Sequence, residues 1–283
     1  MTETQPQPSM PARLELPARA VSGVVMGVVA VAAVAWGGIL FSAIVAAGAI
    51  AALREWHRLV SPGYFLRELI PTGLATIAVV WLAHIPDGVA PALVAILLGA
   101  GSAALLASFR RPAKLWPIPW HGLGAFYVGL PALAFVLLRD EPRGALLVGG
   151  LFVAVWTADT GALFFGRLIG GPKLAPDLSP NKTWAGFLGG TLAAGAGEAL
   201  YVGLLGGAVP RGAAFGIFLA LAGHCGDLFE SWVKRQFRAK NTGRLIPGHG
   251  GMLDRIDSLL FAAPACAALI FLSGFDPLTG GRS

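Results

Sequence analysis

Long apolar runs separated by short polar segments occupy most of the chain. A helix that crosses a bilayer needs roughly 17–25 mainly apolar residues. Lipid offers no partner to unpaired backbone groups, and no run shows the alternation of a membrane β-strand, so we expect a helix in each. The pattern predicts an all-α polytopic membrane protein with about nine transmembrane helices, near residues 20–35, 37–53, 69–85, 88–108, 122–138, 144–165, 184–206, 212–229 and 252–273.

The first two predicted spans share one apolar run, broken near Trp36-Gly37-Gly38, and merging them would reverse the orientation of every later loop. Basic residues decide between the two arrangements, because loops that face the cytoplasm carry an excess of lysine and arginine. With nine spans and a cytoplasmic N-terminus, only Arg139, Arg143, Arg211 and Arg282 face outwards. Sixteen basic residues then face inwards: Arg13, Arg19, Arg54, Arg58, Arg67, Arg110, Arg111, Lys114, Arg167, Lys173, Lys182, Lys234, Arg235, Arg238, Lys240 and Arg244. We therefore predict nine spans in the cell (inner) membrane, with the polar loops 166–183 and 230–251 in the cytoplasm.

Composition agrees with this picture, because 55% of the residues are hydrophobic and 13% are charged, against roughly 25% charged in soluble proteins. The net charge of +6 follows from topology, so we expect no nucleic-acid partner. Cys225 and Cys266 lie in apolar runs and are interpreted as buried small hydrophobic residues. We divide the chain into a flexible cytoplasmic tail (1–19), an N-terminal transmembrane scaffold (20–120) and a C-terminal transmembrane catalytic region (121–283).

The chemistry is concentrated between Asp227 and Asp257. Asp227, Ser231 and Lys234 follow at i, i+4 and i+7, which places them on one helical face. A glycine-rich loop then carries His249, Gly250 and Gly251, where backbone N–H groups can approach an anion. Asp254 and Asp257 share one face where the ninth span begins. These features indicate an anion-binding loop between two helix ends that carry carboxylates.

Any one of these acids alone is readily explained by pairing with a loop cation. Asp227, Asp254 and Asp257 together, rimmed by Lys234, Arg235, Lys240 and Arg255, suit a divalent cation with a polyphosphate. Hard oxygen ligands favour Mg²⁺, which shares its coordination shell with substrate phosphates, and a second metal ion stays open. His249 has no second histidine at ligand spacing. We therefore expect it to donate a hydrogen bond to a phosphate or to order the loop, rather than to bind zinc.

A second group of candidates precedes the seventh span. Ser179, Asn181, Lys182 and Thr183 offer donors at the start of a helix, where anions bind well. The alternative is a helix cap beside a lysine that reaches the membrane surface. Within the sixth span, Asp159 is a functional candidate because burying an acid in lipid is costly. The sequence contains no glycine-lysine-serine/threonine run, which disfavours a P-loop kinase or a transporter ATPase.

These blocks resemble a known family, the phosphatidate cytidylyltransferases, also called CDP-diacylglycerol synthases. The first block reads S-W-V-K-R at 231–235, K-N at 240–241 and P-G-H-G-G-M-L-D-R-I-D at 247–257. The second reads D-T-G-A-L-F-F-G-R at 159–167 and L-A-P-D-L-S-P-N-K-T-W at 174–184. The resemblance covers about residues 156–260. The chain departs from it at Asn241, where members usually have aspartate, at Leu163, where tyrosine is frequent, and at Ala185, where glutamate or glutamine is frequent.

The resemblance implies a nucleotidyltransferase that converts CTP and phosphatidic acid into CDP-diacylglycerol and pyrophosphate, with Mg²⁺ as cofactor and a homodimer as the assembly. It implies a polar cavity open to the cytoplasm and to lipid. It also implies that Asp227 and Asp254, with Asp257 nearby, hold metal, and that Ser231 and Lys234 contact substrate. We add Arg255 to the catalytic group. The candidate substrate-binding residues are Asp159, Ser179, Asn181, Lys182, Thr183, Ser231, Arg235, Lys240, His249, Gly250 and Gly251.

The chemistry fits these residue types independently. A phosphate monoester is already an anionic nucleophile, so the main obstacle is its repulsion by a triphosphate, which metal and fixed cations reduce. Two alternatives remain at this point. One is a related CTP-using enzyme that acts on another lipid phosphate or a polyprenol. The other is a membrane transporter with a pathway at Asp159, which would need polar residues along consecutive spans.

Overall fold

The computed structural model describes residues 12–109, 118–243, 245 and 250–278 of the chain. Within these residues the fold consists of helices and one short β-hairpin, in agreement with the predicted all-α membrane fold. The helices are α1 (Ala12–Trp36), α2 (Gly38–Val60), α3 (Phe65–Leu82), α4 (Val89–Ser108), α5 (Ile118–Asp140), α6 (Gly144–Leu168), α7 (Trp184–Leu204), α8 (Val209–Gln236) and α9 (Leu253–Ser273). The hairpin strands are β1 (Lys173–Ala175) and β2 (Ser179–Thr183).

The eight helices from α2 to α9 are each long and apolar enough to cross a membrane, while the apolar part of α1 over Val21–Trp36 is shorter. The predicted break between the first two spans is confirmed, because α1 ends at Trp36 and α2 begins at Gly38. Gly37 and Gly38 have φ angles of 69° and 53°, a region that side chains disfavour. The Arg139 guanidinium also packs against Gly37, where an added Cβ would lie 2.1 Å from it. The sequence assigned residues 12–19 to the tail, whereas the structure places them in α1.

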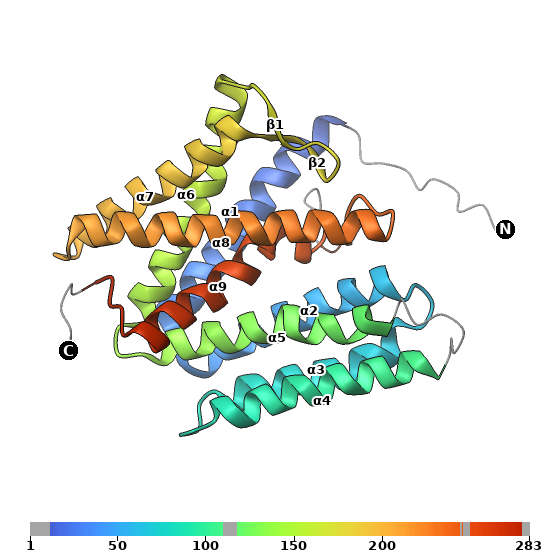
Figure 1. The fold of residues 1–283 in the computed structure, drawn as a ribbon. Helices are drawn as coiled ribbons and strands as arrows, with labels where there is room; N and C mark the ends of the chain where they lie inside the picture. Colours follow the sequence, from blue (N-terminus) through green and yellow to red (C-terminus); the bar gives the residue numbers. More distant parts are fainter. Residues whose placement is uncertain (1–11, 110–117, 244, 246–249, 279–283) are drawn as a thin grey trace.

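Small residues let α6 and α7 pack closely. A Cβ added at Gly190 would lie 2.6 Å from the Ala158 carbonyl oxygen, and one at Gly186 would lie 2.8 Å from that of Ala162. Figure 1 shows these two helices running side by side towards the hairpin. Their close packing therefore fixes the hairpin and the Asp159 side of α6 with respect to each other.

The largest buried cluster joins α2, α5, α8 and α9 through aromatic side chains. The Trp56 indole N–H donates to the Trp120 carbonyl oxygen at 2.8 Å, and the Tyr127 ring packs against Trp56 and Phe229. In Figure 1, α8 crosses the middle of the molecule with α9 and α5 beside it. The N-terminal helix α2 is thereby packed against the C-terminal helices that carry the charged stretch.

A separate polar group joins the beginning of α2 to the ends of α3 and α5. The Ser42 hydroxyl lies 2.8 Å from His84 Nε2, and His84 Nδ1 lies 2.5 Å from an Asp140 carboxylate oxygen. The residue types are those of a nucleophilic triad, but Ser42 is only 2% exposed and its hydroxyl also contacts the Gly38 carbonyl oxygen at 3.2 Å. The group is therefore a structural connection between α2 and the ends of α3 and α5.

Candidate active site where α8 meets α9

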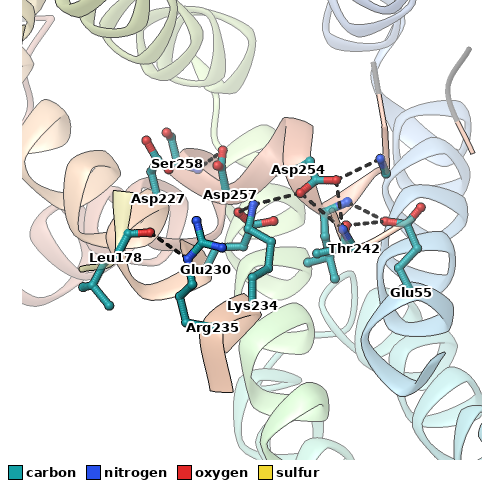
Figure 2. A network of polar contacts seen from close by, with 12 residues as sticks. Glu55, Leu178, Asp227, Glu230, Lys234, Arg235, Thr242, Asp254, Asp257 and Ser258 are labelled. Atoms are coloured by element: carbon teal, nitrogen blue, oxygen red, sulfur yellow. Dashed lines mark hydrogen bonds and ion pairs between the residues drawn. The ribbon is translucent and has the colours of Figure 1, made fainter. Parts of the chain in front are cut away.

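Three carboxylates converge where α8 meets α9. Asp227 and Glu230 of α8 and Asp257 of α9 offer oxygen atoms that all lie within 4.8 Å of one another. Gly226 makes this approach possible, because an added Cβ would lie 2.4 Å from the Asp257 carbonyl oxygen. Figure 2 shows these carboxylates on one side of Lys234, with Asp254 and Glu55 on the other. Negative charge at this density favours a bound cation.

Glu230 is the member of this group that sequence reasoning missed. It is 2% exposed, and one of its oxygens lies 2.5 Å from the Lys234 ammonium. Its other oxygen, Oε1, has no hydrogen-bond partner among the described residues. A signal was present, because Glu230 follows Asp227 by three positions and therefore lies on nearly the same face of α8.

Asp254 lies beside this cluster and binds the loop that follows α8. Its carboxylate accepts from the Lys234 ammonium at 2.9 Å, from the Thr242 N–H at 3.1 Å and from the Gly251 N–H at 3.0 Å. These contacts close the loop that joins α8 to α9. The prediction that Asp254 binds metal stays a prediction, and its oxygens here bind Lys234 and the loop backbone. Lys234 contacts both Glu230 and Asp254 and so links the carboxylate cluster to the loop.

Glu55 of α2 anchors the same loop from the N-terminal half. Its buried carboxylate accepts from the Leu253 N–H at 2.9 Å and from the Thr242 hydroxyl at 3.2 Å. A Cβ added at Gly243 or Gly251 would lie 2.4 Å from this carboxylate, so both positions require glycine's small size. The sequence interpretation treated residues 20–120 as scaffold and missed Glu55. An acid inside an apolar run was the available signal.

The hairpin joins the site from the other side. The Lys182 ammonium forms an ion pair with the Asp227 carboxylate, and Arg235 Nε donates to the Leu178 carbonyl oxygen at 3.2 Å. Thr183 is the N-cap of α7, where its hydroxyl accepts from the Gly186 N–H at 3.1 Å. The cap considered as an alternative for this segment is therefore present, and Lys182 beside it contacts Asp227.

A cavity of about 600 Å³ lies between the hairpin, α6 and α8. Its volume falls within the range of small-molecule sites. The cavity has apolar lining residues, among them Leu163, Phe187 and Leu228. Its polar lining includes six residues that combine both charge signs: Asp159, Ser179, Asn181, Lys182, Thr183 and Asp227. The structure thus brings together the predicted groups at Asp159, 179–183 and Asp227 around one space.

The sequence model of the Cytidylyltransferase family matches residues 17–273. The chain belongs to this family. A phosphatidate cytidylyltransferase of Brucella suis is 40% identical over 261 residues, which cover 92% of this chain and 93% of the relative. One from Pseudomonas aeruginosa is 37% identical over 236 residues, covering 81% and 87%. One from Staphylococcus aureus is 39% identical over 149 residues, covering 52% and 56%.

The family match includes both Glu55 and the carboxylates at the meeting of α8 and α9. Other predicted site residues of this cytidylyltransferase-family chain lie at the edge of the cluster. Arg255, Lys240 and Asn241 are exposed, while Ser231 of α8 is buried at 9% exposure. Gly250 and Gly251 lie beside Asp254, and Gly250 has a φ of 87° that favours glycine. His249 lies outside the described residues. Cys266 is buried as predicted, whereas Cys225 is exposed, so its prediction was wrong.

Proposed function

We propose that this chain is a phosphatidate cytidylyltransferase, which joins CTP and phosphatidic acid to give CDP-diacylglycerol and pyrophosphate. The observation that carries the proposal is the convergence of Asp227, Glu230 and Asp257 beside a polar cavity lined by Lys182. The family membership and the names of the relatives support the same reaction. The transporter alternative gains no support, since Asp159 and Asp227 line one cavity and Glu230 and Asp257 converge with Asp227, an arrangement that is a local cluster and not a path through consecutive spans.

The donor set fits a hard divalent cation. All three converging groups are carboxylates, and Glu230 Oε1 has no hydrogen-bond partner among the described residues although it is buried. Asp227, Glu230 and Asp257 would hold Mg²⁺, with Asp254 as the further ligand predicted from sequence. When bound, Mg²⁺ would neutralise the triphosphate and stabilise the departing pyrophosphate.

The chain's own residues would bind and orient the two phosphates. Lys182 lines the cavity and contacts Asp227, so its ammonium lies where phosphate oxygens would meet the carboxylate cluster. Lys234 is held by Glu230 and Asp254 and adds fixed positive charge. A phosphate oxygen of the lipid attacks the α-phosphorus of CTP, and a new P–O–P link forms. The bond between the α-phosphorus and the oxygen that bridges it to the β-phosphorus breaks, and pyrophosphate leaves. The attacking oxygen is already anionic, so no side chain has to remove a proton.

The two substrates would reach this site from different phases, one from water and one from lipid. CTP is soluble in the cytoplasm, while phosphatidic acid presents its phosphate at the bilayer surface. The excess of basic residues in the loops at 166–183 and 230–251 supports a cytoplasmic orientation in the inner membrane. A homodimer is part of the same proposal, on the strength of the family resemblance.

An assay of the purified chain in detergent, with radiolabelled CTP, phosphatidic acid and Mg²⁺, tests the proposal. We expect labelled CDP-diacylglycerol, and we expect a chelator to abolish its formation. A polyprenyl phosphate offered as competing acceptor separates the related-enzyme alternative, because preferential labelling of that lipid would replace phosphatidic acid as the substrate. Asp177→Asn, which changes an exposed acid between β1 and β2, is a control variant that should make the labelled lipid as the unchanged chain does. A folded preparation that makes no labelled lipid would overturn the proposal.

A further inference from the structure

A second cluster of titratable side chains lies outside the active site, where the ends of α2, α3 and α5 meet. His57 and Glu68 are fully buried at 0% exposure, and His121 is 6% exposed. Each of the three offers a ligand atom within 4.8 Å of the others. They come from three helices, so no local spacing in the sequence brings them together. Two imidazoles and a carboxylate in such a buried position need a chemical explanation.

The hydrogen bonds around His57 define which of its nitrogens faces the cluster. The Thr72 hydroxyl donates to the Glu68 carbonyl oxygen at 2.9 Å, so it accepts from His57 Nε2, which lies 3.0 Å away. The other nitrogen, His57 Nδ1, is buried and has no hydrogen-bond partner among the described residues. It faces the Glu68 carboxylate at 3.6 Å, which is too long for a hydrogen bond.

His121 approaches the same carboxylate from the opposite helix. Its Nδ1 atom lies 2.5 Å from Glu68 Oε2, the oxygen that His57 Nδ1 also faces. A simple histidine–glutamate pair explains the contact of His121 with Glu68. It does not explain His57, whose Nδ1 is directed at this oxygen without a proton-sharing contact. An ion between the three ligand atoms would satisfy all of them.

We propose that His57, Glu68 and His121 form a binding site for a divalent transition-metal ion, with Zn²⁺ as the expected occupant. Two imidazoles and one carboxylate form a ligand set that zinc commonly uses, whereas Mg²⁺ prefers oxygen ligands alone. Zinc–ligand bonds of about 2.0–2.2 Å place tetrahedral ligand atoms roughly 3.3–3.5 Å apart. The separation of His57 Nδ1 and Glu68 Oε2 already matches this value at 3.6 Å. The contact of His121 with Glu68 has to widen by roughly 1 Å to meet it.

Neighbouring groups support the ligands in the manner expected of a metal site. Metal-binding histidines usually donate their other N–H to a fixed acceptor, and Thr72 fills this role for His57. The Ser61 hydroxyl donates to Glu68 Oε1 at 3.3 Å. A cavity of about 520 Å³ reaches Glu68 and His121 and is also lined by Ser61 and Arg67. This cavity gives an ion a way in and leaves space for a water or a small anion as fourth ligand.

The site would fasten α2, α3 and α5 at the end where Glu55 holds the loop that joins α8 to α9, here called the active-site loop. His57 lies two positions after Glu55 on α2, so an ion bound to His57 would fix the position of Glu55 relative to α3 and α5. The proposal does not depend on the proposed function, because its ligands belong to a separate cluster. Its test therefore uses metal binding rather than turnover.

Zinc titration of the full-length, tag-free protein in detergent, followed by calorimetry, tests the site. The protein is stripped with a chelator and kept in excess Mg²⁺, which competes at the carboxylate cluster but not at imidazoles. Cys225→Ser serves as the background, because Cys225 is an exposed thiol. We expect one zinc site per chain. His57→Ala and Glu68→Gln should each weaken it at least roughly 100-fold, and Thr72→Val should weaken it roughly 10- to 100-fold.

The matched control is His84→Ala, since His84 also contacts a carboxylate but lies at the other end of α2 and α3. Its zinc affinity should equal that of the Cys225→Ser background. The absence of a Mg²⁺-resistant zinc site would overturn the proposal, as would equal losses in His57→Ala and His84→Ala. If the cluster variants fail to fold, X-ray absorption of the zinc-loaded background protein decides. Two imidazoles in the coordination shell support the site, and a shell without them overturns it.

Discussion

Two polar clusters in this membrane protein use buried charge in different ways. The cluster of Asp227, Glu230 and Asp257 contains only oxygen ligands, adjoins a cavity of about 600 Å³ through Asp227 and is contacted by lysines. The cluster of His57, Glu68 and His121 combines one carboxylate with two imidazoles that contact it within the protein. The first has excess negative charge that an incoming cation can balance. In the second, His121 and Ser61 already contact the carboxylate, while His57 Nδ1 faces it at 3.6 Å without a hydrogen bond.

This difference separates chemistry from architecture. Two lysines compensate the three carboxylates of the first cluster only in part, and the remaining buried negative charge is costly unless a cation balances it. A compensated cluster contributes to the packing of its helices whether or not substrate is present. We therefore expect substitutions in the first cluster to affect turnover, and substitutions in the second to affect folding stability and binding of transition metals.

The largest effect should follow from Asp257→Asn or Asp227→Asn. Each removes a charge from the carboxylate cluster and should lower kcat roughly 10³-fold, because electrostatic stabilisation of the transferring phosphates is lost. Glu68→Gln should leave kcat near the wild-type value while destabilising the fold by about 1.5–3 kcal/mol through its lost charged hydrogen bonds. Turnover assays and thermal unfolding of the same preparations check both statements. Similar losses of kcat in all three variants would contradict the distinction between the clusters.

The next effect concerns Glu55, which lies in the N-terminal half but serves the active-site loop. Glu55→Ala leaves the Leu253 N–H and the Thr242 hydroxyl without their acceptor, so the loop with Asp254 shifts. A misplacement of about 1 Å costs roughly 10²-fold in kcat/KM. Glu55→Gln retains an acceptor oxygen and should recover part of this loss. Arg54→Gln is the neighbouring control, and an equal loss there would show that α2 acts only through general packing.

A smaller effect is expected from Gly251→Ala. The added methyl group would lie 2.4 Å from both the Glu55 carboxylate and the Thr242 hydroxyl, which forces the loop away from α2. We expect kcat to fall roughly tenfold. Gly73→Ala on α3 is the matched control, because nothing lies within 4 Å of its added Cβ. Steady-state kinetics of the two variants checks this, and unchanged kcat in Gly251→Ala would mean that the close approach is not needed.

The smallest effect should occur next to the carboxylate cluster, at Thr183, which is the N-cap of α7. Thr183→Ala removes the acceptor for the Gly186 N–H and should cost about 1 kcal/mol of stability. Thr183→Ser keeps the cap and should unfold like the wild type in a thermal scan. If both variants unfold alike, the hydroxyl contributes nothing as a cap, and its role would be confined to the cavity that it lines.

Much of the helical framework was predictable because lipid imposes it. Apolar runs gave the positions of the helices, and the glycine pair at 37–38 gave the break between α1 and α2. The β-hairpin was not predicted, since strands of three and five residues carry little periodicity. Its position depends on tertiary contacts such as the one between Arg235 and Leu178.

The candidate site was predictable where its residues are concentrated in short stretches. Asp227, Lys234 and Asp257 lie on two consecutive helices, and the structure brings them into one region (Figure 2). Glu55 could not be assigned, because its partners Thr242 and Leu253 are far away in sequence. The sequence grouped Asp254 with Asp227 and Asp257, whereas in the structure Glu230 is the residue that converges with these two. This difference depends on the angle at which α9 meets α8, which helical spacing alone does not give.

The contact between Glu55 and the active-site loop also has a consequence for biosynthesis. The two bonded pairs are separated by 187 and 198 residues. A growing chain inserts α2 early, while Leu253 begins α9, which emerges only after α3 to α8. Pairing over such a distance requires closure of a long loop, which slows folding. We therefore expect the candidate active site to assemble only after α9 has emerged, so that a chain arrested before α9 stays inert in the membrane.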